Sequence, residues 1–263
     1  AYARFLSNGQ ITLAAGRYAA LASINIGTSE HFLRFHMHFK PSNQLANVPW
    51  GPTQTTLGVA TASVGSACTV GLMFLVWPGV TPTWAILLGT LILEVVLFAS
   101  AFTLGPGRRS SLTLLYGSTR LGSRQLFAWG TLALLASLFL TTVYTIIATA
   151  IAPSLVPSPL PSDLDLSELR WLAFAIIVVV GPFAEETFFR GFLFAGLVRR
   201  LGTASSIAIS SVLFAVAHVD PALFGPALLS GSVFALVYWR TGSVWPAILA
   251  HTAQNAVAFG LTG

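Results

Sequence analysis

The chain has 263 residues, of which 55% are hydrophobic and only 8% are charged, and its formal net charge is +5 at pH 7. Soluble domains carry about 25% charged residues, so this chain has too few charges to cover the surface of a soluble globule. The positive charge does not indicate a nucleic-acid partner, because the arginines lie in short links between apolar runs, as in membrane topology. The composition therefore predicts a polytopic membrane protein in contact with the lipid bilayer.

Residues 1–52 form a segment without a membrane span. They mix Arg, His, Asn, Gly and Pro and contain no sufficiently long apolar run, so we expect this segment to be poorly ordered or to lie on the membrane surface. No charged region followed by an apolar one opens the chain, so we expect no cleavable signal peptide. His31, His36 and His38 lie close together but lack a fourth ligand, and we expect no metal there.

Residues 53–263 contain seven apolar segments, and a spanning helix needs ~20 mainly apolar residues. The segments are 56–77, 83–104, 126–151, 169–199, 203–219, 222–239 and 243–261. In the sixth of them, Gly225-Pro226 could create a re-entrant piece instead of a full span. The pattern predicts an all-α polytopic membrane helix bundle of about seven spans.

The basic links predict how the bundle is oriented. Link 105–125 carries four arginines, Arg199 and Arg200 end the fourth segment, and Arg240 lies between the sixth and the seventh. With seven spans all of these fall on one side, whereas the acidic link 152–168 falls on the other. Cytoplasmic loops carry an excess of Lys and Arg, so we expect a cytoplasmic N-terminus, in the plasma membrane of a prokaryote.

The interiors of the predicted spans, away from their ends, contain few ionisable side chains. Each ionised one costs at least ~2.5 kcal/mol on insertion scales and usually faces the bundle interior, where it has a function. They are Glu94, Glu185, Glu186, Arg190, His218 and His251, with Asn255 beside them. Glu94 fits no motif, and it could snorkel, pair with Arg190 or stay protonated; we favour a structural role for it.

Sequence spacing groups the charged residues of the fourth segment. Glu186 and Arg190 are four residues apart, so they share a helix face and can form an ion pair. Glu185 is turned ~100° away from Glu186, so it can point into a cavity while its neighbour binds the arginine.

The polar residues of the last three segments can converge on Glu185. His251 and Asn255 share one helix face, and Phe214 lies one turn before His218. A carboxylate, two imidazoles and a carboxamide provide a base, proton carriers and oxyanion donors, which are the groups needed to hydrolyse an amide.

Three sequence motifs resemble those of a known family. "EETFFR", "FAVAH" and "HTAQN" are similar, in the same order, to the EExxxR, FxxxH and HxxxN motifs of CPBP-type intramembrane proteases. That family includes the type II CAAX prenyl endopeptidases and bacterial relatives linked to bacteriocin processing and immunity. The resemblance implies a protease core at about residues 169–261, in the last four spans.

The resemblance also implies a role for each polar residue. By it, Glu185 activates the attacking water with His218 beside it, and His251 and Asn255 hold the developing oxyanion. The supporting residues it implies are Glu186, Arg190 and Phe214. The chain has no HExxH, the helical zincin pattern, and we expect no cofactor and no metal, although two Glu and two His on separate helices could bind zinc.

The function expected from this pattern is an intramembrane endopeptidase that cleaves a peptide or protein substrate near the cytoplasmic half of the membrane. Three alternatives remain: a zinc-dependent version of the protease, a non-catalytic membrane binding or immunity protein of the same fold, and a transporter. A transporter is disfavoured because the sequence has no repeated halves with paired broken helices.

Overall fold

The computed structural model describes residues 2–5, 10–14, 24–25, 48–106, 113–117, 121–157 and 168–261. The chain divides into two compact units, Ala1–His38 and Phe39–Gly263. Several residues of the sequence analysis lie outside the described part: His31, His36, His38, Arg108, Arg109, Arg120, Asp163 and Asp165.

The first unit contains three short strands that the sequence did not lead us to expect. Strand β1 (Tyr2–Phe5) pairs antiparallel with β2 (Gln10–Ala14), and β2 pairs antiparallel with β3 (Ile24–Asn25). In the first of these pairs Tyr2 lies opposite Ala14.

The second unit is built from helices. The long ones are α1 (Pro52–Val76), α2 (Pro82–Leu104), α4 (Ser123–Ile151), α7 (Ala195–Ala217), α8 (Pro221–Thr241) and α9 (Trp245–Gly260). The short ones are α3 (Thr113–Tyr116), the 3-10 turn η2 (Pro153–Leu155), α5 (Arg170–Phe174) and α6 (Gly181–Glu186). Two π-helical stretches, η3 (Ala175–Val180) and η4 (Thr187–Phe194), join α5, α6 and α7 into one continuous helical segment, called the path below.

The helices confirm the predicted all-α membrane bundle. Five helical stretches of the described residues are long and apolar enough to cross a membrane, one of them being the 48-residue path Arg170–Ala217. That path holds two predicted spans, because Gly202 interrupts its helical geometry. The seventh predicted span corresponds to α9, which has 16 residues. Helix α8 runs unbroken through Pro226, so Gly225-Pro226 does not create a re-entrant piece.

Gly202 turns the chain back on itself. Its φ of 75° and ψ of 171° belong to a region that is essentially restricted to glycine. After the turn, Ser210 Oγ donates a hydrogen bond of 2.9 Å to the Phe189 carbonyl, and the rings of Phe189 and Phe214 lie 5.2 Å apart. The two halves of the path therefore pack as antiparallel helices, with the residues before and after Gly202 side by side.

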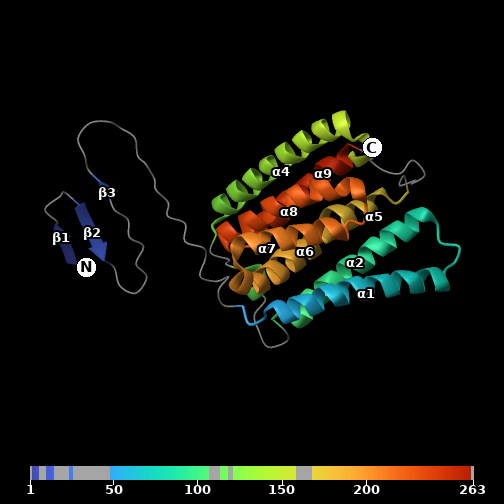
Figure 1. Ribbon diagram of the computed structural model, residues 1–263, viewed down its shortest axis with the longest axis horizontal. Coiled ribbons are helices and arrows are strands. Elements are labelled where there is room, and N and C mark those ends of the chain that lie inside the picture. The colour runs from blue at the N-terminus through green and yellow to red at the C-terminus, as the bar shows by residue number, and fades with distance from the viewer. Residues whose placement is uncertain are drawn as a thin grey trace. The chain divides into compact units, whose positions relative to one another are not determined.

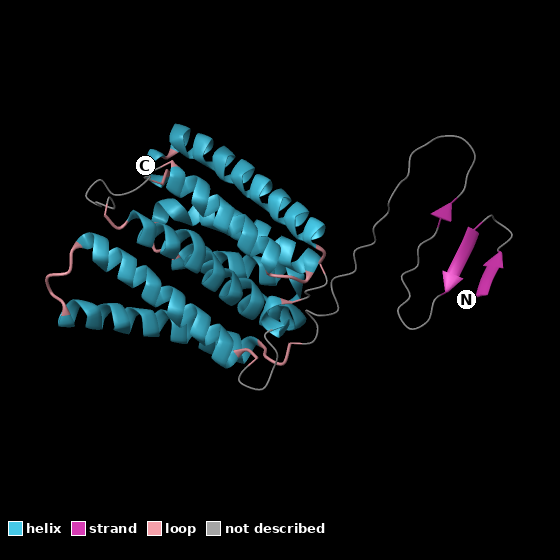
Figure 2. Ribbon diagram, turned by 180° about the vertical axis from the view of Figure 1, so that it is seen from behind, coloured by secondary structure: helices cyan, strands magenta, loops and turns pink. Residues whose placement is uncertain are grey.

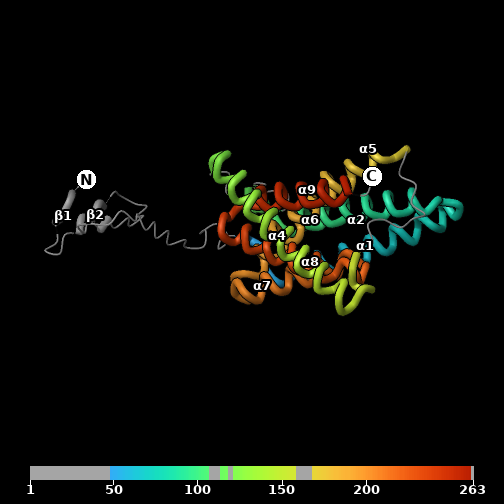
Figure 3. Tube along the Cα trace, turned by 90° about the horizontal axis from the view of Figure 1, so that it is seen from above, coloured from blue at the N-terminus to red at the C-terminus, as the bar shows by residue number. Residues whose placement is uncertain are grey.

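The helices are arranged around this central hairpin. Helices α1 and α2 pair at one flank, where α2 contacts α6, and α4 lies at the other flank against α8 and α9 (Figures 1 and 2). Seen from above, α7 and α9 lie on opposite sides of the bundle (Figure 3). A polar triangle of Ser137, Ser230 and Gln254 joins α4, α8 and α9, as polar side chains often do between membrane helices.

The links predicted to be cytoplasmic meet at one end of the bundle. Val244 N donates to the Tyr116 carbonyl over 3.1 Å, and Gly117 forms an isolated β-bridge with Ser243. Trp50, just before α1, donates its Nε1–H to the Phe192 carbonyl over 2.9 Å. The start of α1, the link before α4 and the link before α9 therefore share one end, as the seven-span order requires.

Replacing Gly202 by alanine tests whether its backbone conformation sets the hairpin. A Cβ at Gly202 or at Gly122 would meet no atom within 4 Å, but only Gly202 has a positive φ, whereas Gly122 has a φ of −61°. We expect Gly202→Ala to lower the unfolding free energy by about 1–3 kcal/mol and Gly122→Ala to leave it unchanged. Thermal unfolding in detergent measures both, and equal unfolding temperatures would show that the turn carries no strain for alanine.

Candidate active site

The central helix, which runs from Arg170 to the turn at Gly202, buries its charged residues halfway along its length. Residues 181–197 are all buried except for Phe183 and Glu185, which are partly exposed. Glu185 therefore differs from Glu186, whose side chain is fully buried. The partial exposure fits the predicted ~100° offset between neighbouring residues on a helix.

Arg190 forms the ion pair expected from its spacing. Its side chain is 0% exposed; Nη1 donates to Glu186 Oε1 over 2.8 Å, and Nη2 donates to the Gly231 carbonyl over 2.9 Å. The guanidinium carbon lies 4.4 Å from the ring centroid of Phe214 and 5.6 Å from that of Phe234. Aromatic faces attract a cation, so three helices bind this one charge.

His251 lies between the two glutamates. Its Nδ1 is 3.0 Å from Glu186 Oε1, and its Nε2 is 3.9 Å from Glu185 Oε2. A carboxylate only accepts hydrogen bonds, so Nδ1 carries the hydrogen and donates to Glu186. This bond orients the ring and presents Nε2 toward Glu185, at a separation too long for a direct hydrogen bond.

His218 joins the same cluster through Phe214. Its Nδ1 lies 2.8 Å from the Phe214 carbonyl, which can only accept, so Nδ1 donates here too. The Phe214 ring lies 4.9 Å from the His218 ring and 5.6 Å from the His251 ring. Both imidazoles thus use Nδ1 for orientation and keep Nε2 for other partners, and Phe214 packs against both of them.

Asn255 is placed by an irregularity of the central helix. Pro182 has no N–H, and in the π-helical stretch the Gly181 N–H bonds to Ile176, so the Ile177 carbonyl loses the backbone donor that residue 182 would supply. Asn255 Nδ2 donates to this carbonyl over 2.9 Å. One of its two amide hydrogens therefore bonds to the backbone of the central helix.

Glu94, for which the sequence analysis favoured a structural role, lies beside the candidate site. It comes from α2 and is 2% exposed, so it does not snorkel. Its carboxyl is in hydrogen-bond contact with Glu185, not with Arg190 as one alternative had it. The signal that could have found it was its position as the one acidic residue of the segment 83–104.

An aromatic layer lies between the site and the basic end of the bundle, which is the end that carries Arg124, Arg199, Arg200 and Arg240. Tyr116 stacks between Phe183 and Trp245, with ring centroids 5.8 and 5.4 Å away. Burial raises the pKa of the Tyr116 phenol, which therefore stays neutral, and it accepts a hydrogen bond of 3.4 Å from Thr187.

The described residues contain no group of three or more His, Cys, Asp or Glu side chains placed to hold a metal ion. Nδ1 of His251 and Nδ1 of His218 are in hydrogen bonds, so each ring has only Nε2 left as a possible ligand atom.

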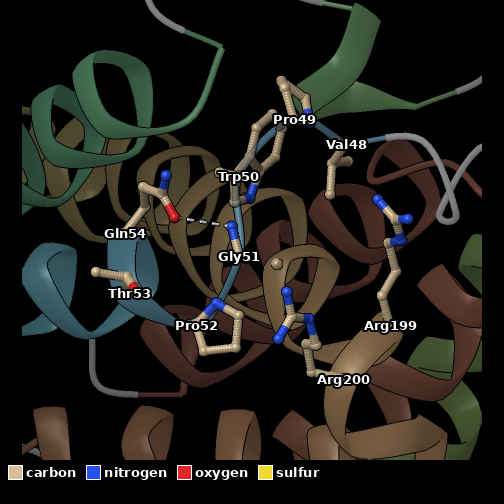
Figure 4. Close-up of a pocket in the computed structure, with 10 residues that line it drawn as sticks. Val48, Pro49, Trp50, Gly51, Pro52, Thr53, Gln54, Arg199 and Arg200 are labelled. Carbon is tan, nitrogen blue, oxygen red and sulfur yellow. Dashed lines mark hydrogen bonds between the residues drawn. The ribbon is translucent and has the colours of Figure 1, made fainter.

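A cavity lies at the end of the bundle that carries Arg199 and Arg200, away from the motif residues. It has a volume of ~450 Å³ and is lined by the residues that open α1 and by Arg199 and Arg200 (Figure 4). Gln54 accepts a hydrogen bond from Gly51 N there, over 3.0 Å. None of Glu185, His218, His251 and Asn255 lines this cavity, so it is separate from the candidate active site.

Comparisons with known proteins agree with the motifs. Residues 167–257 match the family described as type II CAAX prenyl endopeptidase Rce1-like. A Bacillus subtilis (strain 168) protein named "Putative membrane peptidase YdiL" is 33% identical over 92 residues, which is 35% of this chain and 38% of the relative. The matched region thus spans little more than a third of that relative, and no solved structure matches the chain. The resemblance seen in the three motifs is confirmed for this region.

Replacing Arg190 by alanine tests whether the buried ion pair holds the bundle together. The change leaves Glu186 buried without its main partner, and removal of one member of a buried pair typically costs about 3–5 kcal/mol. We expect a large drop in the unfolding temperature of Arg190→Ala in detergent and no change for Arg124→Ala, whose side chain is exposed. A fully stable Arg190→Ala protein would contradict a structural role for Arg190.

Proposed function

We propose that this integral membrane protein is an endopeptidase of the CAAX-protease type, which hydrolyses a peptide bond by means of a water activated by Glu185. The observation that carries the proposal is the pairing of the Glu185 carboxylate with an oriented imidazole: Glu185 Oε2 lies 3.9 Å from His251 Nε2, among mainly apolar helices. This separation is too long for a direct hydrogen bond, and a water beside the two groups can contact both of them.

The site residues have distinct roles in this mechanism. Glu185 accepts a proton from the water while the oxygen attacks the substrate carbonyl, which is general base catalysis. His218 Nε2 and His251 Nε2 are the groups available to exchange protons or to donate to the oxyanion, because each Nδ1 is occupied. The second amide hydrogen of Asn255 is a further donor for the oxyanion. Every step uses side chains and water, without a metal.

The proposed substrate is a peptide or protein at the membrane. The family match supports peptide hydrolysis, and prenylated CAAX peptides are one class to test, beside unprenylated peptides. Glu185 lies ~22 Å along the helix from both Arg170 and Arg200, at ~1.5 Å per residue. The proposed cleavage therefore takes place near the middle of the helix that runs from Arg170 to Gly202.

Glu185→Gln tests the proposed mechanism. Removal of a positioned general base typically lowers the rate by about 10²–10⁴, so purified Glu185→Gln protein should not cleave a peptide library containing farnesylated and unprenylated peptides that the unmodified protein cleaves. The matched control is Glu168→Gln, which makes the same change at an exposed glutamate. A chelator should leave cleavage unchanged. A Glu185→Gln rate within about tenfold of the unmodified rate would remove Glu185 from the mechanism.

Cysteine labelling tests the proposed orientation, in which the basic end of the bundle is cytoplasmic. In a Cys68→Ser background the chain has no other cysteine, and Arg124→Cys and Ser154→Cys place exposed thiols at opposite ends of α4. In sealed right-side-out vesicles, an impermeant maleimide should label the cysteine at position 154 and not the one at 124. The reverse labelling pattern would invert the topology.

A further inference from the structure

Glu94 lies outside all three motifs and outside residues 167–257, which match the family. It belongs to α2, which packs against α1, η3, α6 and η4. Its carboxyl lies beside the backbone of Gly181, where a Cβ would stand 3.6 Å from Glu94 Oε1. Gly181 is one helical turn before Glu185, so Glu94 reaches the face of the central helix that carries Glu185.

The contact between Glu94 and Glu185 requires a hydrogen. Their carboxyl groups are in hydrogen-bond contact, and two ionised carboxylates have no donor. Like charges at this separation also repel, so two carboxyls that share a site hold one proton between them. A hydrogen bond between the two groups therefore needs one carboxylic acid and one carboxylate.

The charges around the pair are consistent with one shared proton. Arg190 Nη1 and His251 Nδ1 both donate to Glu186 Oε1, so Glu186 is already stabilised as a carboxylate. The described elements that contact α2 carry four titratable groups. Glu185, Glu186 and Arg190 lie at the site, and Cys68 of α1 is exposed. His251 on α9 faces Glu185 with Nε2. Among these groups, no cation is paired directly with Glu94.

The free oxygens of the pair lie within the site. Glu94 Oε2 and Glu185 Oε2 are buried and have no hydrogen-bond partner in the protein, and Glu185 Oε2 is the atom that faces His251. A purely structural link between α2 and α6 would need only a neutral side chain such as Gln. A carboxyl at this depth costs at least ~2.5 kcal/mol on insertion scales if ionised, which a structural contact does not explain.

We propose that Glu94 is a positioning residue for the hydrolysis: it shares one proton with Glu185, so that the pair can take a second proton from the attacking water and pass one to the leaving nitrogen; this inference rests on the proposed function. When water attacks the carbonyl carbon, a C–O bond forms and the O–H proton moves to Glu185, so the pair then holds two protons. When the C–N bond breaks, the pair gives one proton to the nitrogen. The pair is then back to one proton, and the products are an acid and an amine.

Glu94→Gln removes the shared proton but keeps a side chain that can donate to Glu185. We expect it to fold normally, to lower kcat by about 10²-fold or more with little change in KM, and to alter the pH profile of kcat/KM. In the unmodified protein, activity should fall at alkaline pH when the pair loses its last proton, and this fall should be absent in Glu94→Gln. Glu94→Asp keeps a carboxyl, so it should retain the alkaline fall and more activity than Glu94→Gln.

A second measurement tests the shared proton without a substrate. At neutral pH the infrared spectrum of the unmodified protein should contain a carboxylic acid C=O band that Glu94→Gln lacks and the control Glu168→Gln keeps. If Glu94→Gln failed to fold, the inference would be tested by the activity of Glu94→Asp and by the C=O band of the unmodified protein. Absence of that band would overturn the shared proton.

The outcomes separate this inference from the proposed function. An inactive Glu185→Gln protein together with a Glu94→Gln protein of unchanged kcat and pH profile would overturn the role of Glu94 and leave the peptidase intact. If no probe peptide were cleaved by the unmodified protein, the peptidase proposal would fail and with it the role of Glu94 in hydrolysis. In that case a C=O band lost in Glu94→Gln would still establish the proton pair itself.

Discussion

The structure depends on how one buried cation is stabilised. Arg190 has no exposed surface, and an unpaired charge at such a position costs several kcal/mol. Its partners come from separate elements: Glu186 from its own helix, the Gly231 carbonyl and Phe234 from α8, and Phe214 from α7. To bind the guanidinium, the central helix, α7 and α8 must adopt fixed positions relative to one another, and the histidines follow from those positions.

The ion pair with Arg190 also gives the neighbouring residues Glu185 and Glu186 different environments. Glu186 Oε1 accepts hydrogen bonds from both Arg190 and His251. Glu186 therefore stabilises the buried arginine and orients the His251 ring. Glu185 is turned ~100° away, is partly exposed, and contacts Glu94 and the free nitrogen of His251. One ion pair therefore fixes the arrangement in which Glu185 is left for the proposed chemistry.

Some of this could be predicted from the sequence and some could not. The helices were predictable because apolar runs end at Gly and Pro, and the pair of Glu186 with Arg190 was predictable because four residues on a helix bring side chains together. The contact of Glu94 with Glu185 depends on which helices are neighbours in the bundle, and spacing within a segment does not encode that. The bond from Asn255 to Ile177 depends on a π-helical stretch next to Pro182, and the proline was the only local signal of that irregularity.

The unequal helix lengths have a consequence for the surrounding lipid. From Arg170 to the turn at Gly202 the helix rises more than ~40 Å at ~1.5 Å per residue, beyond the ~30 Å of hydrocarbon in a bilayer, whereas residues 203–217 and α9 rise only ~22 and ~24 Å at the same spacing. Such hydrophobic mismatch is relieved by tilting of the long helix and by thinning of the bilayer around the short ones. His218 caps one of these short helices, so thinning around that helix would lie beside the site. The thickness of the host membrane would thus affect how readily bulk water reaches the site of the proposed hydrolysis, which consumes water.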